Sequence, residues 1–196
     1  MAWAMALMEI ISEMNQLNQN NIVKLEDISS KFLKYYWNQL VIWDLEKEKV
    51  SENSTILKIV KEFMVKYYTN KNSGAVELFE YVENDMNENY EEKYEKCVKD
   101  IVKIIKMDVS WRFTILDKNN YDQIYDYKKG DDKLVISFKN IIELKKESEN
   151  ILELIKKRWE NLLIGNKGKM KINFSQEEKN GILKLSSSYK IIKIKH

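Results

Sequence analysis

The chain contains a single histidine, a single cysteine, two arginines, five glycines and no proline among its 196 residues. The histidine is His196, so no histidine lies inside the fold to serve as a general base or to activate a serine or cysteine nucleophile. A zinc site needs several cysteine or histidine ligands, which this chain cannot supply. The lone Cys97 cannot form an internal disulfide, which is typical of a reducing cytoplasm. We therefore expect no cofactor.

Phosphate-binding loops and membrane-spanning runs are also missing. Neither Gly-x-x-x-x-Gly-Lys-Ser/Thr nor Gly-x-Gly-x-x-Gly occurs in the chain, so no recognised nucleotide site is predicted. No segment offers the uninterrupted apolar residues that a spanning helix requires. The apolar start, residues 1–8, lacks the basic stretch of a signal peptide. These observations predict a cytoplasmic protein that does not enter a membrane.

The charge balance limits the kind of partner. Lysine and arginine number 33 against 31 acidic residues, a net charge of only +2. A protein that binds polyanions over its whole surface should have a larger basic excess, although a local basic patch is still allowed. The basic residues are almost all lysines, which neutralise phosphate but lack the two-pronged guanidinium that reads guanine. Any DNA binding should therefore be weak, salt-dependent and tolerant of sequence.

Apolar residues recur at three- and four-residue steps over most of the chain, which predicts helices. These helices are expected at residues 3–17, 27–40, 56–68, 75–82, 90–106 and, starting at 138 or 141, to about 163. After Gly165 the period changes to two, which predicts short strands at residues 170–174, 182–185 and 189–195. We expect a mainly α fold: a multi-helix domain, 1–164, with a small antiparallel β element at the C-terminus, 165–196, packed on it or on a partner.

The run Phe32–Gln39 is the most distinctive stretch, because three adjacent aromatic residues are followed by two amides. Neighbouring residues of a helix point about 100° apart, so the three rings cannot share one narrow stripe. We expect Tyr36 in the core, Trp37 filling a groove against a neighbouring helix, and Tyr35 half-exposed. The alternative is a contact surface for nucleic acid or protein. The candidate contact residues are Lys31, Lys34, Tyr35, Trp37, Gln39, Arg112 and Arg158. The order of a short extended piece and then a helix, residues 22–39, is also typical of winged-helix modules.

Carboxylates could supply chemistry of their own. Asp131-Asp132-Lys133, with Asp122 or Asp126 upstream, matches the acid, acid-x-Lys pattern of metal-dependent nucleases. Chance alone predicts about five acid-x-Lys matches in a chain of this composition, so the pattern discriminates poorly. A metal-dependent nuclease is therefore one alternative, and a homo-oligomeric structural protein is another.

Several segments in order resemble the N-terminal region of bacterial HNH-endonuclease-domain proteins of the restriction or antiviral defence type. These segments are Trp3–Leu7, Asp27–Gln39, Trp111–Phe113 with Tyr125 and Leu134–Ile136, and the long helix with Trp159. The resemblance covers about residues 3–164. HNH chemistry needs a histidine base, which the chain lacks, so no catalytic residue is carried over. The resemblance implies a non-catalytic recognition or assembly module, not an enzyme by itself, whose expected partners are double-stranded DNA, a nuclease subunit or a second copy of the chain.

Overall fold

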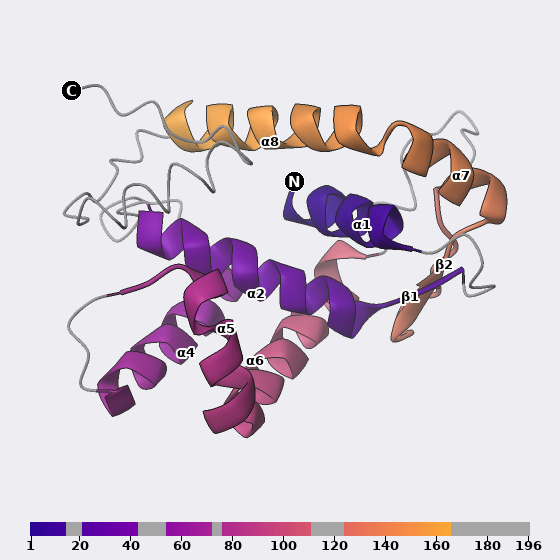
Figure 1. Ribbon diagram of the computed structural model, residues 1–196. Coiled ribbons are helices and arrows are strands. Elements are labelled where there is room, and N and C mark those ends of the chain that lie inside the picture. The colour runs from indigo at the N-terminus through magenta and orange to yellow at the C-terminus, as the bar shows by residue number, and fades with distance from the viewer. Residues whose placement is uncertain (15–20, 43–53, 72–75, 111–123, 166–196) are drawn as a thin grey trace.

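The computed structural model describes residues 1–14, 21–42, 54–71, 76–110 and 124–165, and this part of the chain is mainly helical (Figure 1). Its elements, in chain order, are α1 (Ala2–Glu13), β1 (Ile22–Lys24), α2 (Leu25–Ile42), α4 (Thr55–Lys71), α5 (Phe79–Asn89), α6 (Glu91–Ile104), the π-helical turn η2 (Ile105–Val109), β2 (Lys133–Val135), α7 (Phe138–Lys146) and α8 (Ser148–Gly165). No helix among these residues is long and apolar enough to cross a membrane.

The helices form layers around α2. Figure 1 shows α8 along the outer edge, α1 beneath it, then α2, and finally α4, α5 and α6 on the far side. Helix α1 lies between α8 and α2 and is apolar nearly all round, as expected of a helix covered on more than one side. Its buried residues are Ala2, Trp3, Met5, Ala6, Leu7, Met8 and Ile11. The rest of the core lies where α2 packs on α4 and α6.

Helix α2 is a central helix. Of its 18 residues only Glu26 and Asp27, in the first turn, are exposed. Its neighbours are α1 on one side and α4, α5 and α6 on the other. A recognition helix must present a free face to the DNA groove. The winged-helix interpretation of residues 22–39 is therefore wrong for α2, because other helices already cover its faces.

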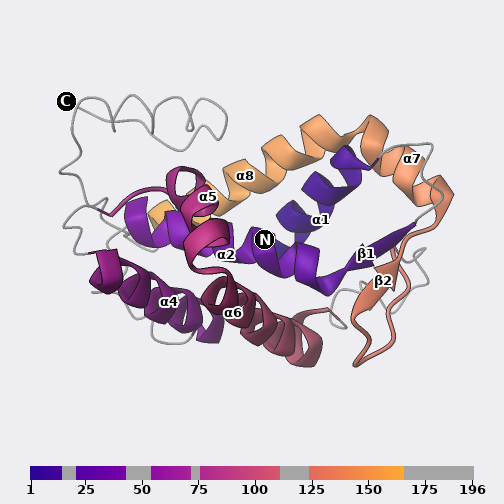
Figure 2. The same cartoon turned by 60° about the horizontal axis from the view of Figure 1, so that its bottom comes forward.

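The small sheet is not where the sequence pattern predicted it. Strands β1 and β2 pair antiparallel with Val23 opposite Leu134, and Figure 2 shows the pair at one end of the molecule, beside α7. Val23 and Leu134 are buried. Three-residue strands carry too little periodicity to reveal that two segments so far apart in the chain would pair. The expected C-terminal strands lie in residues 166–196, outside the described residues.

Most helix positions match the periodicity, with one clear difference. The single helix expected from residue 138 or 141 to about 163 is divided into α7 and α8 at Glu147. The Ser148 hydroxyl donates a 2.8 Å hydrogen bond to the Lys145 carbonyl, and such side-chain bonds compete with helix continuation. Cys97 is buried in α6, as the pattern predicted.

Candidate functional site

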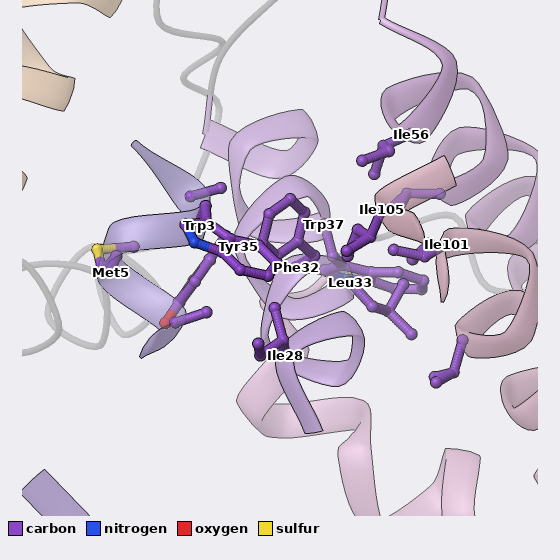
Figure 3. Packing of buried hydrophobic residues seen from close by; sticks show 14 of the residues in the cluster. Trp3, Met5, Ile28, Phe32, Leu33, Tyr35, Trp37, Ile56, Ile101 and Ile105 are labelled. Atoms are coloured by element: carbon purple, nitrogen blue, oxygen red, sulfur yellow. The ribbon is translucent and has the colours of Figure 1, made fainter. Parts of the chain in front are cut away.

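Trp37 is the centre of the aromatic core. Its side chain is fully buried, and its indole Nε1 donates a 2.9 Å hydrogen bond to the Glu77 carbonyl (Figure 3). Four rings surround it at centroid distances of 5.8–6.0 Å, from Phe63, Tyr67, Tyr68 and Phe79. The expectation that Trp37 fills a groove against neighbouring helices is confirmed. A ring with no exposed surface cannot contact a partner, so Trp37 is a core residue.

The two tyrosines are arranged opposite to the expectation. Tyr35 is buried with its ring edge-on to Trp159, at a centroid distance of 5.9 Å. Tyr36 is only partly buried, and its ring lies between Phe32 and Trp159 at 6.0 and 6.3 Å. The reason is that α1 and α8 cover the side of α2 from which Tyr35 projects. Burial also raises the pKa of the Tyr36 hydroxyl. Tyr35 is therefore not a contact residue.

The amide Asn38, which the sequence pattern did not select, ties α2 to the start of α5. Its Oδ1 accepts a 2.8 Å hydrogen bond from the Phe79 backbone N–H, and its Nδ2 donates to both carboxylate oxygens of Glu80 at 3.0 and 3.1 Å. The first backbone N–H groups of a helix have no partner within the helix, so Asn38 supplies a cap from another element. The selected neighbour, Gln39, is only partly buried.

Replacing Asn38 with alanine should destabilise the protein by about 1–2 kcal/mol, because a helix cap and a hydrogen bond to a charged group are lost together. Urea unfolding of the variant measures the effect. Asn87→Ala, at an exposed position of α5, is the matched control and should change stability little. Equal stabilities of the two variants would show that the cap contributes nothing.

A surface pocket of about 470 Å³ lies beside the two candidate lysines. It is formed where the end of α1 meets α2, α5 and α6. The lining residues are Ile10, Glu13, Met14, Asp27, Ser30, Lys31, Lys34, Phe79, Glu83 and Tyr94. Burial, as the main cause, raises the pKa of the Tyr94 hydroxyl. The pocket thus combines apolar side chains with charges of both signs.

Carboxylates hold both lysines of this pocket. Lys31 Nζ lies 3.2 Å from Glu9 and 3.0 Å from Glu13, which ties α2 to α1. Lys34 Nζ lies 3.2 Å from Glu80, which ties α2 to α5. An incoming phosphate would have to displace these carboxylates and would meet further negative charge in the pocket. The geometry makes Lys31 and Lys34 links between helices and disfavours an anion here.

The two arginines are separate from this pocket. Arg112 lies outside the described residues. Arg158 is exposed on α8, and after burial its positive charge is the second cause that lowers the pKa of the Met1 amino group. The structure therefore does not gather the seven candidate contact residues into one surface.

The acidic candidates are also not arranged as a metal site. Asp132 forms an ion pair with Lys106, and Asp131 follows the turn at Gly130, whose φ is +98°. The backbone of Asp126 forms a bridge to Val135, with its side chain exposed. Asp122 lies outside the described residues. Within the part of the chain that the structure describes, no group of three or more His, Cys, Asp or Glu side chains could hold a metal ion.

A basic surface that the sequence pattern did not select lies on α4. This helix contains four lysines and a single acidic residue, Glu62. Lys58, Lys61 and Lys66 are exposed on its outer face. Neither Lys58 nor Lys66 has an ion-pair partner among the described residues. The excess of lysine over acid within this one helix was the available signal.

Comparisons of the chain with protein-family models, curated proteins and solved structures find no match.

Proposed function

We propose that this chain is a non-catalytic recognition and assembly module of the HNH-nuclease type, and that it binds the DNA backbone through the outer face of α4. The observation that carries the proposal is the set of exposed lysines, Lys58, Lys61 and Lys66, on a helix with one acidic residue. Lysines that neutralise phosphates release condensed counterions, and this release drives DNA binding that does not depend on sequence.

The outer face of α4 suits this role better than α2 does. Lys31 and Lys34 on α2 are already held by glutamates, whereas Lys58 and Lys66 keep their charge without an ion-pair partner among the described residues. Lys58 and Lys66 are eight residues apart on one helix, which separates their Cα atoms by about 12 Å, enough to reach different phosphates. With lysine in place of arginine, the binding is expected to be weak and tolerant of sequence.

A nuclease subunit is the second candidate partner. Phe138 and Ile142 are 50% and 58% exposed, and they lie four residues apart on α7. Side chains at this spacing share one face of a helix. Large apolar side chains that are exposed together favour a protein partner, so this pair supports binding to another subunit.

We predict that the double variant Lys58→Glu/Lys66→Glu binds DNA much more weakly than the parent. If each lysine neutralises one phosphate, the slope of log affinity against log salt should fall in magnitude by about 2. Fluorescence anisotropy of a short labelled duplex, over a series of salt concentrations, measures both quantities. The control is Lys99→Glu/Lys103→Glu, at exposed α6 lysines that already pair with Glu95 and Asp100.

Two further arms separate the alternatives. Residues 166–196 contain eight lysines and two glutamates, so Lys184, Lys190, Lys193 and Lys195 are changed together to glutamine. Loss of binding in this variant but not in the α4 variant would refute the α4 proposal. Plasmid DNA incubated with the chain and Mg²⁺, Mn²⁺ or Zn²⁺ should remain uncut. Cleavage that disappears in Asp132→Ala would support the metal-dependent nuclease instead.

A further inference from the structure

We infer that the outer face of α8 binds a second copy of this chain, with the two α8 helices antiparallel. The α8 outer face consists of Glu149, Asn150, Glu153, Leu154, Lys157 and Arg158, all of which are exposed. The inference goes beyond the proposed DNA binding through α4 and does not depend on it, because α8 lies at the opposite edge of the layered helices (Figure 1).

The α8 outer face is the side of the helix turned away from the body. Ile151, Leu152, Ile155 and Trp159 are partly buried against the core, and α1 is the main helix that α8 contacts. On the other side, Leu154 is 67% exposed, more than any other large apolar side chain among the described residues. An exposed leucine amid charged neighbours at helical spacing is typical of the centre of a helix–helix contact.

The charges on this face are complementary to themselves. Both acids, Glu149 and Glu153, precede Leu154, and both bases, Lys157 and Arg158, follow it. In a two-fold symmetric pair, each surface must match its own copy after rotation. Antiparallel helices would place the acidic half of one copy opposite the basic half of the other, with the two Leu154 side chains near the axis. Parallel helices would place like charges together.

The same charge pattern argues against other occupants. A DNA backbone would meet the carboxylates of Glu149 and Glu153 as well as the two bases. Glu153 and Lys157 are also neighbours four residues apart within one helix, but that pairing gives no reason for an exposed leucine between the acids and the bases. Helix α8 has 18 residues and a length of about 27 Å, so the contact is small and the dimer should dissociate in the micromolar range.

The first test is the mass of the full chain in solution. Sedimentation equilibrium over a range of protein concentrations should show a rise from the monomer mass of 23.5 kDa towards twice that value. Leu154→Glu should remain at the monomer mass. Val65→Glu, at a 55% exposed position on α4, is the matched control and should associate as the parent does.

The second test reverses the charges. Lys157→Glu/Arg158→Glu makes the α8 outer face acidic, and Glu149→Lys/Glu153→Lys makes it basic. Each variant alone should be monomeric through like-charge repulsion, and an equimolar mixture should form the dimer again. Circular dichroism of each variant checks that the fold is retained. A parent that stays monomeric at every concentration, or reversed variants that dimerise alone, would overturn the inference and leave the face to another partner or to residues 166–196.

Discussion

Trp37→Ala should lower the free energy of unfolding by about 3–5 kcal/mol, because it empties a fully buried site of the largest side chain. The indole contacts four aromatic rings from three segments and donates a hydrogen bond to the Glu77 carbonyl. Removing it would leave that carbonyl without its indole partner and open a cavity between α2 and α4. Chemical denaturation with urea, compared with the parent, measures the loss.

Two other variants isolate the cause. Trp37→Phe retains most of the apolar volume and loses the Glu77 bond, so it should cost clearly less than alanine. Trp159→Ala removes a ring of the same size that is only partly buried, so its effect should be about 1–3 kcal/mol, as expected for partial burial. If Trp159→Ala proves as damaging as Trp37→Ala, exposure does not decide the cost of losing a ring in this fold.

The second large effect should be a loss of stability at alkaline pH. Burial raises the pKa of the Cys97 thiol from 9.0 to about 12, with a smaller contribution from Asp100. The unfolded chain would therefore release the thiol proton near pH 9 while the folded chain keeps it. Stability from this group is complete below the unfolded pKa and declines as the pH rises towards the folded value. By about pH 11 the loss should reach about 2–3 kcal/mol.

Urea unfolding of the parent and of Cys97→Ala at about pH 7, 9 and 11 tests this expectation. The variant is expected to be less stable at neutral pH, because it loses a buried side chain, but its decline with pH should be shallower. Burial also raises the pKa of Tyr125, whose hydroxyl donates to the Ser110 carbonyl at 2.9 Å, so some decline should remain above about pH 10. Parallel pH curves for parent and variant would show that Cys97 has no part in it.

The helical spacing of apolar residues was enough to predict most of the described helices and the burial of Cys97 in α6. It also predicted that Trp37 packs against neighbouring helices. These features depend on which side chains share a face, and a period of 3.6 residues encodes that directly. The mainly helical composition of the described residues follows from the same local rule.

The chain pattern could not specify which element would cover each face. Tyr35 is buried and Tyr36 partly exposed because α1 and α8 lie on one particular side of α2. Likewise, Lys31 and Lys34 resemble free phosphate ligands in the sequence, but α1 and α5 bring glutamates to within ion-pair distance of them.

The sequence by itself determined the helices and their apolar stripes. Only the tertiary structure decided that α2 is central, that β1 pairs with β2, and that exposed lysines remain on α4. Helical periodicity acts between residues three or four positions apart, whereas the packing of whole elements depends on contacts between segments far apart in the chain. A surface is therefore defined by what the packing leaves uncovered, and no local pattern contains that information.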